Sequence, residues 1–311
     1  MKRIDQMNAP AGIRRRHRDR ADRKFYTLMM ILPVAQILIF YFGVNFQSIC
    51  MAFQKYDAKN NVFIWDTSKN LTLFKIDIQM AGFWNMIGNS LKVWVFTSLS
   101  GTVLAVTFAY YIYRRNLMSN FFKFVLFLPS VLPGIMLVAM YRNFVGEGIP
   151  AFMQYLFDTD VVKIFLGSND GLRLNIITLF TVWVSFGPQV LVYTGAMDQI
   201  DPAIMEAGKI DGVSPVQEFF SLILPNIMST VGTFLTIGIA SIFTNQNNLF
   251  SFLNFDVIAP TEKNIGYYLF FLINSSRVGT YYCYAAFLGL LFTLIVAPLA
   301  FAARKFFDRE V

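Results

Sequence analysis

The sequence predicts an all-α membrane protein with six transmembrane helices. Of its 311 residues, 56% are hydrophobic and only 14% are charged, a balance that disfavours a soluble enzyme. The 26 basic and 19 acidic side chains all lie outside six windows of 18 to 23 residues. A helix needs roughly 20 apolar residues to cross about 30 Å of hydrocarbon, so each window is long enough to span a membrane. The windows are 26–46, 93–113, 124–141, 174–195, 225–244 and 281–303.

The distribution of lysine and arginine predicts the orientation of these spans. With the N-terminus in the cytoplasm, the inner segments carry 16 basic residues in 74 positions and the outer segments carry 10 in 114. This asymmetry follows the positive-inside rule and predicts that both termini are cytoplasmic. The expected organisation is a basic cytoplasmic tail (1–25), a first transmembrane helix (26–46), an extracytoplasmic loop (47–84), a transmembrane domain (85–303) and a short cytoplasmic tail (304–311).

The N-terminal region carries a basic run, Arg14-Arg15-Arg16-His17-Arg18, ahead of the first apolar window. A secretory signal has this order, but the apolar run of some 21 residues is long and no small-x-small cleavage site follows Gly43. We therefore expect the first span to remain in the protein. A basic run directly before a span is more typical of a topology determinant or a lipid-headgroup contact than of nucleic-acid binding.

The residue inventory narrows the possible chemistry. Two cysteines and one histidine cannot build a Cys/His zinc cluster or a disulfide framework. Cys50 and Cys283 fall near predicted outer membrane edges, so either a bridge or two separate thiols is compatible with the sequence. The six windows contain no ionisable side chain of the kind that secondary carriers and channels use. A membrane enzyme with a Ser/His dyad is disfavoured because the only histidine, His17, lies in the basic tail.

Polar residues and helix breakers interrupt the spans. The breakers are Pro33, Pro129, Pro133, Gly134, Gly187 and Pro188. They either line a cavity, as in transporters, or are ordinary residues of membrane helices. Hydroxyl, amide and aromatic side chains in the fourth and fifth spans suit a neutral polyhydroxylated solute or, equally, helix packing. These side chains are Trp183, Ser185, Gln189, Tyr193, Thr233, Thr236, Ser241 and Asn245.

The loop 198–225 between the fourth and fifth spans has strong local signals for helix, turn and helix. Asp201 can cap a helix whose first residue is Pro202, and Gly212 can adopt the positive φ of a turn. Ser214 and Gln217 match a capping box for a second short helix. An isolated helix of eight residues is marginal in water, so another part of this protein or a separate subunit is expected to pack on it.

In this loop the sequence resembles the membrane subunits of type I ATP-binding-cassette importers. Their signature stands here as Glu206-Ala207-Gly208, then Gly212, then Ile223-Leu224-Pro225, with Gly208 in place of alanine. Further motifs are similar to the carbohydrate-importing branch, and the likeness covers about residues 25–306. These motifs are Leu32-Pro33, Met51-Ala52-Phe53, Asn89-Ser90-Leu91, Phe127-Leu128-Pro129-Ser130, Trp183 and Phe186-Gly187. Asn247-Asn248-Leu249 stands where the family has Gly-Gly-Pro.

The resemblance implies a transport subunit, not an enzyme, in a bacterial or archaeal cell membrane. Its implied partners are a second permease, a homodimeric ATPase, an extracytoplasmic solute-binding protein, membrane lipid and a sugar. The chain has no Gly-x-x-x-x-Gly-Lys-Ser/Thr motif, so it is expected to bind no cofactor, and ATP and magnesium are implied for the ATPase. The residues implied to couple to the ATPase are Ala203, Glu206, Ala207, Gly208, Asp211 and Gly212.

The resemblance also implies a translocation site between the fourth and fifth spans. Spacing from Glu206 carries this site onto Trp183, Ser185, Gly238, Ser241 and Asn245. Trp183 is the expected stacking surface for a sugar ring, although each of these residues is also compatible with helix packing alone. Which sugar or related solute is carried stays open at this stage.

Overall fold

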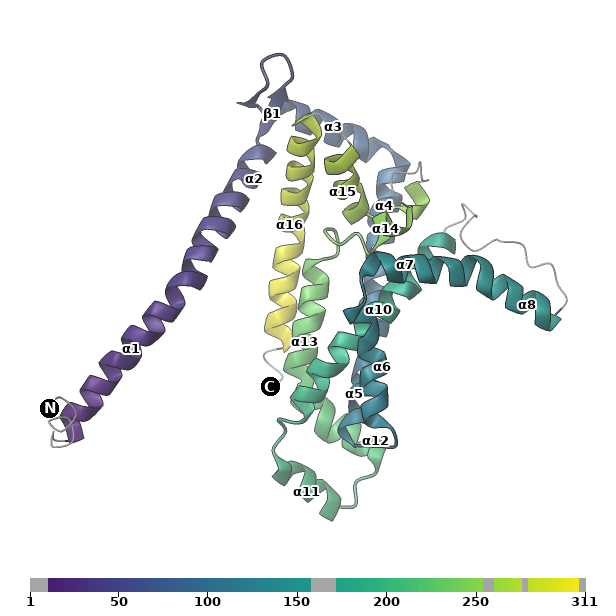
Figure 1. Cartoon of the computed structure of the whole chain (residues 1–311). Coiled ribbons are helices and arrows are strands. Elements are labelled where there is room, and N and C mark those ends of the chain that lie inside the picture. Colours follow the sequence, from purple (N-terminus) through teal and green to yellow (C-terminus); the bar gives the residue numbers. More distant parts are fainter. Residues whose placement is uncertain (1–10, 158–171, 254–259, 276–278, 308–311) are drawn as a thin grey trace.

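The computed structural model describes residues 11–157, 172–253, 260–275 and 279–307, and these form a helical bundle (Figure 1). Within these residues, five helices are long and apolar enough to cross a membrane: Arg23–Ala52, Ala81–Tyr113, Leu172–Met197, Pro215–Ala240 and Tyr281–Phe307. A sixth candidate is the pair Ser119–Val131 and Gly134–Phe157, which is bent by 104°. The predicted all-α membrane class is thus confirmed, with one span strongly bent.

The first span consists of α1 (Ala11–Gln36), a π-helical segment η1 (Ile37–Val44) and α2 (Asn45–Ala52). Its most apolar stretch buries no residue against the rest of the chain. Only the α2 end lies close to the bundle, beside α16 (Gly279–Phe307), and α1 diverges from it (Figure 1). Pro33 lies inside α1 and does not interrupt it.

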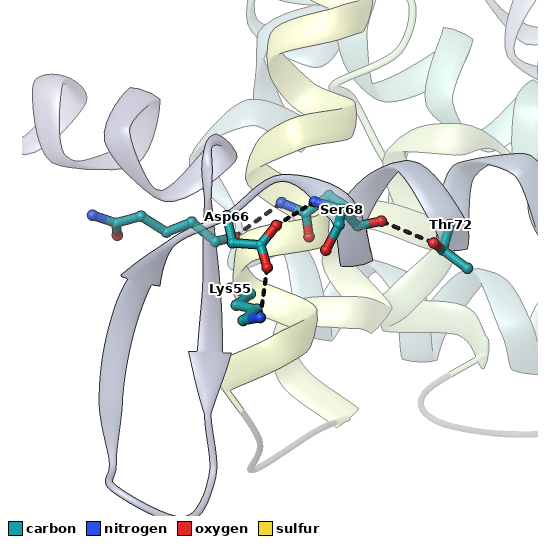
Figure 2. A network of polar contacts seen from close by, with 6 residues as sticks. Lys55, Asp66, Ser68 and Thr72 are labelled. Atoms are coloured by element: carbon teal, nitrogen blue, oxygen red, sulfur yellow. Dashed lines mark hydrogen bonds and ion pairs between the residues drawn. The ribbon is translucent and has the colours of Figure 1, made fainter.

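The loop after the first span is folded. It contains an antiparallel hairpin of β1 (Gln54–Asp57) and β2 (Val62–Trp65), followed by α3 (Ser68–Gln79). Asp66 accepts hydrogen bonds from Lys55 Nζ at 2.5 Å and Ser68 N at 2.8 Å, and Thr72 Oγ1 donates to Ser68 O at 2.8 Å (Figure 2). The donors on Asp66 hold the pKa of its carboxyl group well below the usual range. The all-α prediction missed this hairpin.

The second and third spans meet at a short turn. The second span comprises α4 (Ala81–Val95), the π-helical segment η2 (Phe96–Ser100) and α5 (Gly101–Tyr113). The third comprises α6 (Ser119–Val131), α7 (Gly134–Asn143), the π-helical segment η3 (Phe144–Gly148) and α8 (Ile149–Phe157). The break falls at Leu132 and Pro133, because proline has no N–H to continue the helix. Of the predicted breakers, Pro129 and Pro188 lie inside continuous helices.

The fourth span is α10 (Leu172–Met197), and α11 (Pro202–Ile210) follows it. Next come α12 (Pro215–Gln217), the π-helical segment η4 (Glu218–Ile223) and α13 (Leu224–Ala240), which join into one helix. The prediction of a short second helix in this loop was therefore wrong, because the capping box at Ser214 begins the fifth span itself. The fifth span also ends at Ala240, four residues before the predicted Thr244.

The last part contains α14 (Leu249–Leu253), the 3-10 turn η5 (Pro260–Glu262), α15 (Ile265–Ser275) and α16. Cys50 and Cys283 are both free, so two separate thiols replace the alternative of a bridge. We call the two ends of the bundle the α11 end and the hairpin end, after the elements that lie there (Figure 1).

Gly187 lies where α10 packs closely on α6. A Cβ atom added to Gly187 would lie 2.0 Å from the carbonyl oxygen of Leu126 in α6. Such a separation is far below van der Waals contact, so only glycine fits at this position. Gly187, expected to break the fourth span, instead lets an unbroken α10 pack directly on α6.

Candidate functional site

The first candidate site is α11, which has strong stop signals at both ends. Asp201 accepts a hydrogen bond from Ala203 N at 2.9 Å, and Pro202 occupies the first helical position. At the other end Gly212 has φ +68, and its N–H donates to Lys209 O at 3.2 Å. Val213 N donates to Gly208 O at 3.0 Å, which completes a Schellman motif. The predicted start and turn of this helix are confirmed.

The capping box that begins the fifth span is also confirmed. Ser214 N donates to Gln217 Oε1 at 3.0 Å, and Gln217 N donates to Ser214 Oγ at 3.4 Å. Only Gly212 and Val213 lie between the Asp211 cap of α11 and Ser214. Two well-capped helices joined by so short a turn have little freedom to move independently.

Most of the α11 surface is uncovered. Gly208 is its one buried residue, and a Cβ added there would lie 2.6 Å from Leu222 Cδ1 in η4. Ala203, Glu206, Ala207 and Asp211 are exposed, and Ile210 is 86% exposed. Figure 1 shows α11 beyond the end of the bundle, so the described part of the chain covers only the Gly208 face.

The second candidate site is a polar, partly open cavity of about 40 Å³ between two spans. It lies between the second span and the end of α13, and is lined by Trp94, Thr97, Ser98, Ser241, Ile242, Asn245 and Asn247. Thr97 and Ser98 belong to the π-helical segment η2, a distortion that often occurs at functional sites. The indole N–H of Trp94 is buried and has no hydrogen-bond partner among the described residues.

Gly238 lets the two walls of this cavity come together. A Cβ atom at Gly238 would lie 2.8 Å from Ser98 Oγ and 3.2 Å from Trp94 Nε1. Ser241 and Asn245 line the cavity and Gly238 lies against Ser98 and Trp94 in its wall, so these three residues, which the sequence predicted together, meet at one place. Trp94, Thr97, Ser98 and Asn247 were missed. The available signal was the spacing of four residues between Trp94 and Ser98, which both lie in the charge-free window 93–113.

Trp183 and Ser185 do not line the cavity. Trp183 lies beside Tyr141, with ring centroids 6.4 Å apart, and beside Phe180 at 6.0 Å. Ser185 Oγ donates to Val182 O in its own helix at 3.3 Å. The structure thus separates the five predicted substrate-path residues into two groups, with the fifth-span group at the cavity.

The loop after α13 holds the cavity's polar wall in place. Asn247 and Asn248 have φ angles of 50° and 60°, a left-handed conformation that asparagine tolerates better than most residues. Asn247 N donates to Asn245 Oδ1 at 2.8 Å, and Asn264 Nδ2 donates to Asn245 O at 3.1 Å. The two asparagines therefore hold the backbone of this turn in a left-handed conformation.

Apolar spans, a polar cavity between them and an uncovered capped helix at one end are typical of a membrane transport subunit. Residues 98–311 match the family described as binding-protein-dependent transport system inner membrane component. The chain belongs to this family and is a component of a bacterial membrane transporter, not an enzyme. The resemblance stated from the sequence is confirmed.

Curated relatives are permease proteins of bacterial transporters. The chain is 22% identical to the multiple sugar-binding transport system permease protein MsmF of Streptococcus mutans, over 73% of this chain and 76% of the relative. It is 29% identical to the probable ABC transporter permease protein YesP of Bacillus subtilis, over 47% and 52% respectively. The match to the probable ABC transporter permease protein MG188 homolog of Mycoplasma pneumoniae is 28% identical and spans 43% of this chain but only 39% of that relative.

A solved structure shares the fold. It is a bacterial ABC transporter involved in the import of the acidic polysaccharide alginate, with a TM-score of 0.72 and 20% identity. The match covers 94% of this chain and 99% of the alginate-transporter chain. A second structure of an alginate transporter, in complex with an alginate pentasaccharide-bound periplasmic protein, has a TM-score of 0.68 and 21% identity, over 94% and 95%.

Proposed function

We propose that this chain is a permease subunit of an ATP-driven importer and forms half of the pathway for a sugar or oligosaccharide. The supporting observation is the uncovered, doubly capped α11, a rigid surface without an occupant in the described chain. The proposed partners are a second permease, a homodimeric ATPase that binds ATP and magnesium, and an extracytoplasmic solute-binding protein. The α11 end and both termini face the cytoplasm in this proposal, following the positive-inside distribution of basic residues.

Coupling runs from α11 to the cavity through one continuous helix. The exposed Ala203 and Ala207 let a partner approach the α11 backbone closely, and Glu206 offers it a carboxylate. A displacement of α11 reaches the fifth span through the Gly208 contact with Leu222 and through the Gly212 turn. From Pro215 to Ala240 this span is roughly 40 Å long, and the cavity lies where it ends. ATP binding then favours one of two packings of the span.

The cavity supplies hydrogen-bonding groups suited to hydroxylated solutes. Its indole N–H, hydroxyl groups and amides can donate to and accept from sugar hydroxyls without a full charge. A volume of about 40 Å³ holds a few water molecules, and the cavity is partly open. In this proposal the cavity widens to admit a solute when α13 moves away from the second span.

Charge reversal and turn disruption at α11 test the coupling role. Glu206→Lys is expected to leave the chain inserted but to uncouple uptake from ATP hydrolysis, because it reverses the charge offered to the ATPase. Gly212→Pro is expected to do the same, because φ near −65° cannot replace +68° and the bond to Lys209 O is lost. Uptake and ATPase activity of the assembled transporter in proteoliposomes measure both effects.

Lys209→Gln is the matched control, since it changes an exposed charge on the same helix. Normal uptake by both Glu206→Lys and Gly212→Pro would refute the docking role. Solute transport by the chain alone, without nucleotide, would favour a self-sufficient carrier.

Filling the cavity tests the proposed substrate path. Gly238→Ala places a methyl group against Ser98 and Trp94 and is expected to lower uptake about ten-fold or more, a cost of at least ~1.4 kcal/mol. Gly289→Ala is the control, because no atom lies within 4 Å of its added Cβ. Retained ATPase stimulation with lost uptake supports a role in the path, whereas loss of both indicates a folding defect.

A further inference from the structure

A larger cavity lies at the α11 end, apart from the proposed substrate path. Its volume is about 410 Å³, and it lies between the α5–α6 turn and the end of α10. It is lined by Ile112, Tyr113, Arg115, Ser119, Asn120, Lys123, Thr194 and Asp198. Tyr110, one turn before the end of α5, donates to Pro215 O at 2.9 Å, which fixes this turn beside the start of the fifth span.

The charges around this cavity favour an anion. Arg115 and Lys123 are exposed, and neither forms an ion pair within the described ranges of the chain. Asp198 is the one carboxylate in the lining, so the lining carries an excess positive charge. Ser119 and Asn120 add hydrogen-bond donors to the lining. Helix α6 begins at Ser119 without a side-chain cap, so the positive end of its dipole also faces this region.

Large apolar side chains surround the same turn. Leu117 is 83% exposed, and Met118, Phe121 and Phe124 are also exposed. Along the sequence, Leu117 and Met118 directly precede Ser119, Phe121 follows Asn120, and Phe124 follows Lys123. A basic and hydrogen-bonding hollow beside exposed apolar side chains, at the level where two spans end, is the arrangement found at a lipid headgroup layer.

We propose that this cavity binds the phosphate headgroup of an anionic phospholipid. Arg115 and Lys123 contact the phosphate, Ser119 and Asn120 donate to its oxygens, and Leu117, Met118, Phe121 and Phe124 contact the acyl chains. Free phosphate shares the headgroup chemistry but leaves the apolar side chains without a role. The site depends on a membrane-embedded chain and not on the proposed coupling or substrate path.

Lipid retention by the full-length chain, purified with the subunits that accompany it, tests this site. The protein is equilibrated with equal amounts of phosphatidylglycerol and phosphatidylcholine in detergent, and retained lipid is quantified by native mass spectrometry. We expect phosphatidylglycerol to be enriched. Arg115→Gln and Lys123→Gln should each lower the enrichment roughly five-fold. Asp198→Asn should raise it, because it removes the opposing charge.

Lys305→Gln is the matched control, since it removes an exposed basic residue at the end of α16. Enrichment that is absent, or that falls equally in Lys305→Gln, would overturn the site. Displacement of the lipid by millimolar inorganic phosphate would assign the cavity to a soluble anion instead. Enrichment in the isolated chain that disappears in the assembled transporter would assign it to a subunit contact. The gain in Asp198→Asn separates specific loss of binding from misfolding.

Discussion

At the residue scale, glycines mark where the spans approach one another. Gly187 faces a backbone carbonyl of α6, Gly238 faces Trp94 and Ser98, and Gly208 faces Leu222. The cost of a methyl group depends on what it meets. A backbone carbonyl cannot move without displacing a helix, whereas the end of a leucine side chain can rotate away. The alanine that the family signature has at position 208 is therefore compatible with this fold, and alanine at 187 is not.

Gly187→Ala is expected to lower the free energy of unfolding by about 2 kcal/mol or more, because α10 and α6 must separate to admit the methyl group. Gly195→Ala on the same helix meets no atom within 4 Å and is expected to be neutral or stabilising by up to about 1 kcal/mol. Thermal unfolding of the detergent-solubilised protein measures both. Equal melting temperatures for the two variants would contradict the close approach.

At the element scale, the loop after the fourth span and the fifth span act as one unit. Capping chemistry determines where α11 ends and where the next helix begins, since each capping residue lies within five residues of its partner. The length of the second helix does not follow from its cap. Pro215 stands at the helix start, where its missing N–H would have no partner within the helix. Pro225 lies inside the continuous helix, directly after the π-helical segment η4, and the helix continues to Ala240.

Ser214→Ala removes the side-chain half of the capping box and is expected to cost about 1 kcal/mol of local stability. Amide hydrogen exchange should therefore rise in residues 216–218. Ser221→Ala, an exposed serine further along the same helix, is expected to leave these rates unchanged. Equal exchange in the two variants would mean that tertiary packing, not the cap, holds this end.

At the scale of the whole molecule, the described chain divides into a packed bundle and an unpacked first span. The three buried clusters draw their residues from the chain beyond residue 81. The first span between Arg23 and Val44 contributes none, although it is among the most apolar segments. Its surface therefore faces lipid or another subunit and adds little to the stability of the isolated chain.

A pair of phenylalanine substitutions tests this division. Phe180, which is 1% exposed, packs against Tyr141 and Phe252, so Phe180→Ala is expected to cost about 3 kcal/mol or more. Phe42 is 64% exposed, and Phe42→Ala is expected to change the unfolding free energy of the isolated chain by less than about 0.5 kcal/mol. Chemical unfolding in detergent measures both. A large loss for Phe42→Ala only in the assembled transporter would identify a subunit contact.

The sequence by itself determined the membrane class, the approximate spans, and the caps and turn around α11. These properties depend on apolar length and on hydrogen bonds between residues close in the chain, both of which can be followed along a sequence. Only the tertiary structure decided that the third span bends at Pro133 while Gly187 and Pro188 leave α10 unbroken. It also decided that Gly238, Ser241 and Asn245 meet Trp94 and Ser98 while Trp183 packs elsewhere. Contacts between spans depend on how the helices are rotated and how closely they approach, and no local pattern specifies either.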